Sequence, residues 1–293
     1  MDSKLTFRLP LVISLVAVLV ACGAGLSRPV TLADIRSEAL QQGFSSQMIE
    51  SWGYRMQVFH RGLSRLSPDA DPVDPVVYIE GDGRAYVSRH RVSADPTPRN
   101  PVAFRLAAVD PSPAVIYIAR PCQFVVTARC QPRDWTSHRY STEIVAAMSG
   151  VLDQLHSDYA IRGYALVGYS GGGVIAALLA QQRADIDSLT TVAANLDHEA
   201  WTSHFGDTPL SGSLNPIDRA EALADLPQIH LAGRRDTTVP AFVIERFVQA
   251  LPVSAPAEYY LLENKSHTNW PDSWYKTVCD LRFWQQRPGC NSL

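Results

Sequence analysis

The sequence predicts an α/β fold with a mostly parallel central sheet and helices on both faces. Short runs rich in β-branched residues recur along the chain, for example VVYIE at 76–80 and YALVG at 164–168. These runs are apolar throughout, which is typical of strands covered on both faces. From about residue 137 onward, helical segments separate the runs. This alternation favours parallel strands joined by right-handed crossovers.

The N-terminal segment is expected to lie outside this fold. Lys4 and Arg8 precede the apolar run LVISLVAVLVA at 11–21, which is short for a transmembrane helix and typical of a signal peptide. The run ends in LVAC, which resembles the lipobox of bacterial lipoproteins. That resemblance implies a signal peptide at 1–21, a lipid anchor on Cys22 and a place in the bacterial cell envelope, with Gly23 favouring the outer membrane. An ordinary secretory signal and an uncleaved anchor are the alternatives.

The remaining elements follow in chain order. A helix at 31–43 is predicted from a Thr31 N-cap and a terminal Gly43, within a linker and helix segment at 22–50. The domain at 51–293 then has room for a small cap at 198–226. The strands are expected at 54–63, 76–80, 113–119, 164–168, 189–196, 228–233 and 258–263, and the helices at 137–159, 172–183 and 242–251. The Pro-rich stretch at 93–113 is expected to be a surface excursion.

The composition and net charge limit the classes of function that the chain can have. The chain has 293 residues, 46% of them hydrophobic and 19% charged, which is enough for one sizeable core. Its formal net charge is -3, so no global charge favours nucleic acid as a partner. We expect a small-molecule or acyl substrate and a membrane contact through the N-terminal anchor. The sequence leaves the oligomeric state open.

Apart from Cys22, the chain has four cysteines, Cys122, Cys130, Cys279 and Cys290. An even number in a chain that leaves the cytoplasm favours disulfides, and four cysteines allow three pairings. We favour the local pairs Cys122–Cys130 and Cys279–Cys290. No CxxC or HxxxH spacing indicates a metal site, and no cofactor is implied.

Ser170 stands in GYSGG at 168–172, between a predicted strand and a predicted helix. The G-x-S-x-G pattern in that setting indicates a nucleophile elbow, where flanking glycines leave room for a strained turn. The helix that follows aims its free N–H groups and positive dipole end at a developing oxyanion. A bare G-x-S-x-G also occurs by chance, so the partners of Ser170 decide its role.

With this elbow the chain resembles the α/β-hydrolase family from about residue 54 to 284. The family's triad order is serine, acid, histidine. The segment RRDTTVP at 234–240 resembles the family's acid turn, which makes Asp236 the expected acid. Asp197, at the end of the preceding strand, is the competing acid. His267, in the loop after the last strand, is the expected base because no other of the eight histidines fits the chain order.

The resemblance also implies an oxyanion hole. One N–H would come from Gly171, after the nucleophile, and another from the loop EGDG at 80–83. Asp82 is the expected second donor and Gly83 the alternative; a plain Gly-rich turn is the other interpretation of this loop. Glu80 stands where family members commonly have histidine. The carboxylate of Asp82 would repel an oxyanion, so its side chain is expected to turn away from the site.

These residues favour a serine hydrolase that cleaves a carboxylic ester or thioester through an acyl-enzyme. A serine peptidase or amidase of the same fold is the first alternative, because fold and triad serve both. A hydrolase-like envelope binding protein without turnover is the second. Arg120, after the strand at 113–119, is either a contact for an anionic substrate group or part of a structural ion pair.

Overall fold

An eight-stranded sheet forms the centre of the molecule, which is described here from a computed structural model covering residues 30–67 and 69–280. The strand order is β1-β2-β6-β3-β7-β8-β9-β10. From β6 to β10 along this order, neighbouring strands are parallel. Strand β2 pairs antiparallel with both β1 and β6. The predicted mostly parallel sheet is therefore confirmed.

The strands lie close to the apolar runs that predicted them. Their bounds are β1 Ser45–Ser51, β2 Tyr54–Arg61, β3 Val76–Ile79, β6 Val115–Ile118, β7 Tyr164–Tyr169, β8 Ile186–Val192, β9 Gln228–Gly233 and β10 Ala257–Leu262. All residues of β3, β6, β7 and β9 are buried. Apolar runs without alternation thus mark strands covered on both faces, as expected for a parallel sheet.

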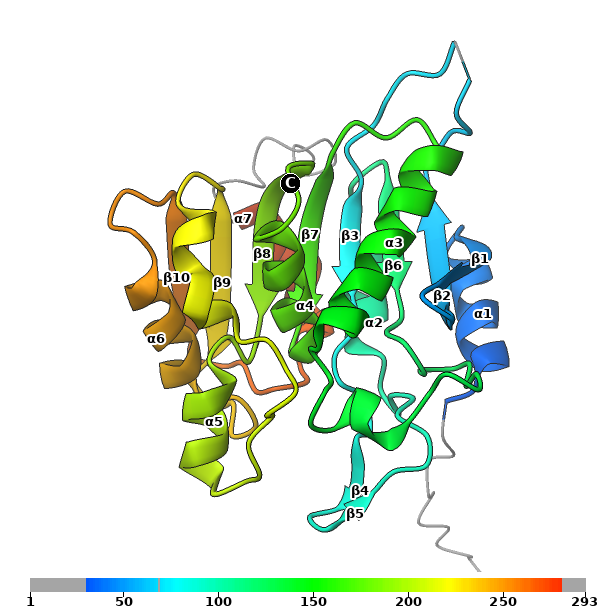
Figure 1. Cartoon of the computed structure of the whole chain (residues 1–293). Coiled ribbons are helices and arrows are strands. Elements are labelled where there is room, and N and C mark those ends of the chain that lie inside the picture. The colour runs from blue at the N-terminus through cyan, green and yellow to red at the C-terminus, as the bar shows by residue number, and fades with distance from the viewer. Residues whose placement is uncertain (1–29, 68, 281–293) are drawn as a thin grey trace, which may run out of the picture.

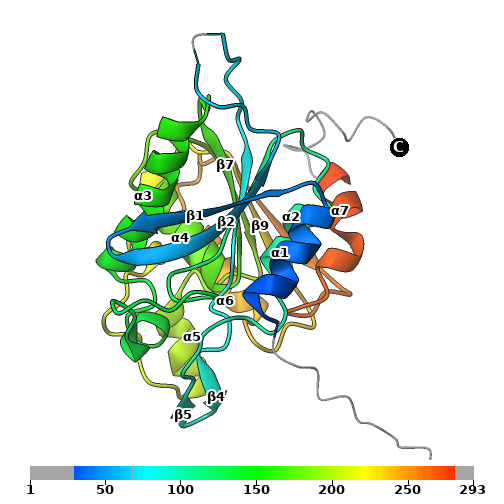
Figure 2. The ribbon, with the colours of Figure 1, turned by 90° about the vertical axis from the view of Figure 1, so that its right-hand side faces the viewer.

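Helices cover both faces of the sheet, as Figure 2 shows from its edge. One layer holds α3 (Thr142–Asp158), α4 (Gly171–Ala180) and α6 (Ala241–Ala250), and the other holds α1 (Leu32–Gln41), α2 (Val102–Ala108) and α7 (Trp274–Asp280). Each layer has its own apolar core: the first contains Val151, Val174 and Phe247, and the second contains Ile35, Phe104 and Trp274.

Several elements were not predicted, among them β1, β4 (Tyr86–Ser88), β5 (Arg91–Val92), α2 and α7. Strand β1, with the sequence SSQMIES, is polar and stands at the sheet edge, where backbone pairing replaces a buried apolar pattern. The ribbon of β4 and β5 is short and largely exposed. Helix α2 corrects the expectation of a surface excursion at 93–113, because five of its seven residues are buried against the sheet.

The carboxyl ends of the parallel strands point to one edge of the sheet, at the bottom of Figure 1. Helix α5 (His198–Phe205) and the β4–β5 ribbon extend beyond this edge. The segment expected to form a small cap, 198–226, holds α5 and a 3₁₀ helix at Pro216–Leu223. Among the described residues, no helix is long and apolar enough to cross a membrane.

The cysteine predictions have different outcomes. Cys122 and Cys130 form a disulfide, with their Cα atoms 5.8 Å apart. Cys279 lies in α7, but its predicted partner, Cys290, falls outside the described residues. The predicted signal peptide and Cys22 also lie outside them, so the anchor remains a prediction.

Candidate active site

Ser170 occupies the sharp turn between β7 and α4. Its φ is +52°, a conformation that a residue with a side chain adopts only under strain. The flanking glycines make the turn possible. A Cβ atom on Gly168 would lie 2.4 Å from the carbonyl oxygen of Gly172, and one on Gly172 would lie 2.1 Å from the carbonyl oxygen of Ile79. The tight packing of α4 against β7 and β3 therefore requires glycine at both positions.

Ser170, His267 and Asp236 form a hydrogen-bonded row. The Oγ of Ser170 lies 3.1 Å from Nε2 of His267, and Nδ1 of His267 lies 2.8 Å from Oδ2 of Asp236. The other carboxylate oxygen of Asp236 accepts hydrogen bonds from the backbone N–H groups of Thr238 and Val239, both at 2.8 Å. The carboxylate therefore holds the proton of the imidazole on Nδ1 and leaves Nε2 free to accept the serine proton.

Tyr169, next to the serine, also holds the histidine loop. Its hydroxyl donates to the backbone carbonyl of His267 at 2.9 Å, and the two rings lie 5.3 Å apart. The sequence analysis did not single out this residue. Tyr169 is the variable residue before the serine in G-x-S-x-G, and nothing in that motif indicates a contact with a loop almost a hundred positions away.

The competing acid, Asp197, has a different set of partners. It caps α5, accepting the N–H of Ala200 at 3.0 Å, and its other oxygen pairs with Arg246 at 2.7 Å. The carboxylate that contacts His267 is that of Asp236. Asp197 is thus a structural residue that starts a helix.

The two expected oxyanion donors, Gly171 and Asp82, lie side by side. A Cβ atom on Gly171 would be 2.1 Å from Oδ1 of Asp82, and one on Gly81 would be 3.3 Å from the Cβ of Ser170. Among the described residues, neither the N–H of Gly171 nor that of Asp82 donates a hydrogen bond. Both remain available to an oxygen atom bound beside Ser170.

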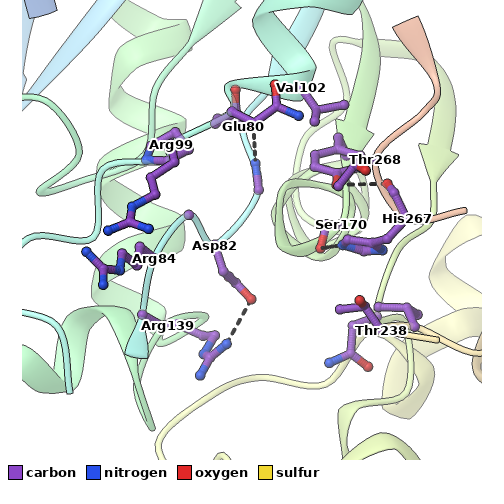
Figure 3. Close-up of a pocket in the computed structure, with 18 of the residues that line it drawn as sticks. Glu80, Asp82, Arg84, Arg99, Val102, Arg139, Ser170, Thr238, His267 and Thr268 are labelled. Carbon is purple, nitrogen blue, oxygen red and sulfur yellow. Dashed lines mark hydrogen bonds and ion pairs between the residues drawn. The ribbon is translucent and has the colours of Figure 1, made fainter. Parts of the chain in front are cut away.

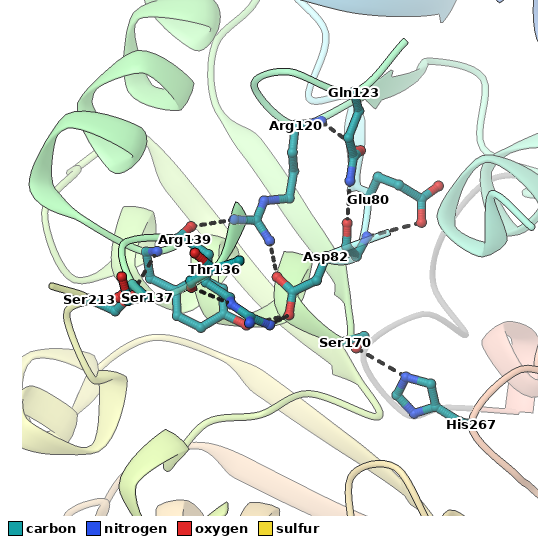
Figure 4. Close-up of polar contacts among 12 residues, drawn as sticks. Glu80, Asp82, Arg120, Gln123, Thr136, Ser137, Arg139, Ser170, Ser213 and His267 are labelled. Atoms are coloured by element: carbon teal, nitrogen blue, oxygen red, sulfur yellow. Dashed lines mark hydrogen bonds and ion pairs between the residues drawn. The ribbon is translucent and has the colours of Figure 1, made fainter. Parts of the chain in front are cut away.

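Three side chains hold the carboxylate of Asp82, and Figure 4 shows two of them, Arg120 and Arg139. Arg139 and the Tyr140 hydroxyl donate to Oδ2 at 2.8 and 2.9 Å, and Arg120 donates to Oδ1. Burial alone would raise the pKa of Asp82, but the charges of Arg139 and Arg120 outweigh it and lower this pKa to about 2. The negative charge is thereby neutralised beside the candidate oxyanion site. Of the two roles weighed for Arg120, the structure shows the ion pair.

Glu80 anchors the same loop from the opposite side. It is buried, and its carboxylate accepts the N–H of Gly81 at 3.0 Å, the Tyr117 hydroxyl at 3.2 Å, and two N–H groups of the first turn of α2, each at 3.4 Å. Burial raises the pKa of Glu80 to about 7, although these hydrogen bonds oppose the shift. At the position where the resemblance in the sequence would place histidine, Glu80 is a carboxylate that ties the loop to α2.

The row opens into a cavity of about 540 Å³, shown in Figure 3. Asn195, after β8, lines the cavity, and its buried Oδ1 has no hydrogen-bond partner among the described residues. The strand expected at 189–196 included Asn195, so no pattern in the sequence indicated a role at the site; in the structure β8 ends at Val192. No group of three or more His, Cys, Asp or Glu side chains in the described ranges is arranged to hold a metal ion.

Comparison with known proteins establishes the fold. No protein-family model and no curated protein sequence matches the chain significantly. Solved structures do match. One is an esterase of Pyrococcus furiosus, with a TM-score of 0.57 and 13% identity; the match covers 85% of this chain and 95% of the esterase chain. Another is a serine hydrolase homologue of Coxiella burnetii, with a TM-score of 0.53 and 15% identity; the match covers 80% of this chain and 97% of the homologue's chain.

A puromycin hydrolase also matches, with a TM-score of 0.56 and 18% identity over 80% of this chain. The chain spans only 37% of the length of that enzyme. At these identities the likeness concerns the fold. It agrees with the strand order and helix layers described above and identifies the α/β-hydrolase fold, as the resemblance in the sequence predicts.

Proposed function

We propose that this chain, which has the α/β-hydrolase fold, is a serine hydrolase that cleaves a carboxylic ester or thioester through an acyl-enzyme. The observation that carries the proposal is the row Ser170–His267–Asp236, with both hydrogen bonds at 3.1 Å or less, at the wall of a cavity. The base, His267, is in direct contact with both the nucleophile and the orienting acid.

The chemistry follows from this geometry. Nε2 of His267 takes the proton of Ser170 as Oγ attacks the carbonyl carbon of the ester. The carbonyl oxygen becomes an oxyanion and accepts the N–H groups of Gly171 and Asp82. His267 then gives its proton to the departing alkoxide or thiolate, leaving the acyl group on Ser170. Water, deprotonated by His267, attacks the acyl-enzyme and releases the acid and the free serine.

The choice of an ester over an amide rests on which solved structures match this chain over nearly their whole length. The solved esterase and the serine hydrolase homologue match this chain over 95% and 97% of their own lengths, whereas the puromycin hydrolase is much longer. A match over nearly the whole length of a solved esterase supports an esterase or acyl hydrolase. Cleavage of an aminoacyl amide faster than its ester would favour the amidase alternative.

The proposal is tested with a fluorophosphonate, which reacts with activated serines, and a 4-nitrophenyl ester. We expect covalent labelling, release of nitrophenolate and loss of both in Ser170→Ala, with the circular dichroism spectrum unchanged. Labelling that survives the substitution would exclude Ser170 as the nucleophile. A chain that neither labels nor hydrolyses any ester would instead be a binding protein.

We also propose that Cys22 carries a lipid anchor that holds the domain in the bacterial cell envelope. The support is the apolar run that ends in LVAC after two basic residues. Incorporation of an alkyne-labelled palmitate into the full-length chain, and its loss in Cys22→Ser, tests this. Incorporation that persists in Cys22→Ser would contradict it.

A further inference from the structure

The cavity wall across from the proposed nucleophile is basic. Arg84 and Arg99 line the same cavity as Ser170 and His267, and Figure 3 shows their guanidinium groups on the opposite side of it. Arg84 is half-buried and Arg99 is exposed. In the described part of the chain, neither side chain makes a hydrogen bond or an ion pair. Two cations thus face one space without an anion between them.

Nearby carboxylates do not neutralise this pair. Asp82 is already bonded to Arg139 and Arg120, two cations for one anion, so that group itself carries net positive charge. Glu80 is buried and its oxygens accept backbone N–H groups and the Tyr117 hydroxyl. The acidic residues of this wall therefore have other partners.

The backbone places the two arginines together. The N–H of Arg84 donates to the carbonyl of Pro96 at 2.9 Å, which joins the loop after β3 to the segment that leads to Arg99. Gly83, with a φ of +66°, allows this approach, because a Cβ atom there would lie 2.0 Å from the same carbonyl oxygen. The backbone therefore holds the oxyanion loop, which carries Arg84, against the segment that leads to Arg99.

Positive charge continues along the β4–β5 ribbon. Residues 83–95 contain Arg84, Arg89, His90 and Arg91 and a single acidic residue, Asp95, whose carboxylate accepts the N–H of Thr97 at 2.8 Å. A second cavity, of about 530 Å³, shares Tyr86, Arg139 and Trp201 with the first. Its charged lining consists of Arg89 and Arg139 and one carboxylate, Asp207, with His90 beside them, so cations outnumber anions there. A negatively charged substrate that approaches along the β4–β5 ribbon is thus attracted toward Ser170.

We propose that the ester carries a carboxylate, which Arg84 and Arg99 bind while the scissile carbonyl lies at Ser170. The substrate would be either a half-ester of a dicarboxylic acid or a neutral acid esterified to a hydroxy acid. Guanidinium groups suit this recognition because they donate charge-assisted hydrogen bonds to carboxylate oxygens. The inference rests on the proposed function and adds the class of substrate to it.

The test compares matched charged and neutral esters. For the acyl side, the mono-4-nitrophenyl esters of adipate, suberate and sebacate are compared with 4-nitrophenyl hexanoate, octanoate and decanoate. For the alcohol side, 4-carboxyphenyl butyrate is compared with 4-carbamoylphenyl butyrate. We expect kcat/KM to be about tenfold or more higher for the charged ester in one of the two arms. The arm that responds identifies the side that carries the carboxylate.

The arginines are tested by the same ratio. In Arg84→Gln and Arg99→Gln the charged-to-neutral ratio of kcat/KM is expected to fall severalfold, and in the double variant to approach one. Arg55→Gln is the control, because Arg55 is an exposed arginine of β2 outside both cavities. Its ratio should equal that of the unmodified chain.

The outcomes separate the two proposals. Equal rates for charged and neutral esters in both arms would overturn the inference and leave the hydrolase intact. A preference that persists in the double arginine variant would also overturn it. Absence of hydrolysis together with absence of fluorophosphonate labelling at Ser170 would overturn the proposed function, and this inference with it.

Discussion

Arg139 donates to the carboxylate of Asp82 at 2.8 Å, joining two residues 57 positions apart. Figure 4 shows this contact together with that of Arg120 to the same carboxylate, which also accepts the Tyr140 hydroxyl. The backbone N–H of Asp82 is a proposed oxyanion donor, so the side-chain contacts of this residue fix the position of its own N–H. The carboxylate that would repel an oxyanion is held by cations and serves to position the loop.

We expect Asp82→Asn to lower kcat by about 100-fold with a small change in KM. The substitution displaces the backbone N–H of residue 82, and this N–H stabilises the transition state more than it stabilises the bound ester. It should also lower the free energy of unfolding by about 3–5 kcal/mol, because Arg120 and Arg139 are left buried without a counterion. Steady-state kinetics and urea unfolding measure the two effects.

Asp74→Asn is the matched control for Asp82→Asn. Asp74 pairs with Arg162 at 2.8 Å, but both side chains are exposed. Loss of such a pair changes the free energy of unfolding by less than about 1 kcal/mol. If the two variants had equal stability and equal kcat, the positioning role of Asp82 would be wrong.

Glu80 makes stability depend on pH. Burial raises its pKa in the folded chain to about 7, above the value of an unfolded chain, so folding favours the protonated acid. The stabilising contribution is complete below the unfolded pKa and is lost as pH rises toward 7. The free energy of unfolding should therefore fall by roughly 3 kcal/mol between about pH 4.5 and pH 7 through this residue.

The variant Glu80→Gln isolates that contribution. Glutamine stays neutral at every pH, so the variant should lose this part of the pH dependence while other carboxylates keep theirs. Urea unfolding of both proteins at pH 5 and pH 7.5 gives the comparison. An identical change in the free energy of unfolding for both would show that Glu80 does not titrate in this range.

The Cys122–Cys130 disulfide closes a loop that supports the oxyanion segment. Gln123, inside the loop, donates to the carbonyl of Gly81 at 2.8 Å, and its Oε1 accepts the N–H of Arg120. Replacing both cysteines by alanine should lower the free energy of unfolding by about 2–3 kcal/mol, as expected for a cross-link of this length. Ester hydrolysis should also slow. Thermal unfolding and kcat of the double variant, compared with the oxidised parent, measure both.

Local patterns explain what the sequence could predict. The buried strands are continuous apolar runs, and Ser170 and Asp236 each follow such a run, whereas His267 follows the half-buried strand β10. A parallel sheet collects the carboxyl ends of its strands at one edge, so residues distant in sequence come together without further information. The fold class could therefore be predicted from these patterns, whereas the choice of Asp236 and His267 also used the triad order that the α/β-hydrolase resemblance implies.

The contacts around the oxyanion loop could not be predicted, because they join segments with no local signal. Helix α2 is seven residues long and lies in a Pro-rich stretch, so it is too short to show a helical period in the sequence. Its first turn supplies two of the N–H groups that bind Glu80. Arg139 lies before a helix in a polar loop, and nothing in that loop indicates Asp82 as its partner.

The contact between Asp236 and His267 gives the sharpest test of the acid. Asp236→Asn replaces the Oδ2 acceptor by an N–H donor, which favours the imidazole tautomer with its proton on Nε2. That tautomer cannot accept the proton of Ser170. We expect kcat for a 4-nitrophenyl ester to fall by about 10³–10⁴-fold, and the rate of fluorophosphonate labelling to fall in parallel.

Asp197→Asn is the matched control, because Asp197 was the competing acid in the sequence. Its carboxylate caps α5 and pairs with Arg246, so the substitution should cost about 1 kcal/mol of stability through the weakened cap and ion pair. The kcat should stay near that of the parent, because the structure places no contact between Asp197 and His267. A large loss of kcat in Asp197→Asn, with Asp236→Asn still active, would reverse the assignment of the acid.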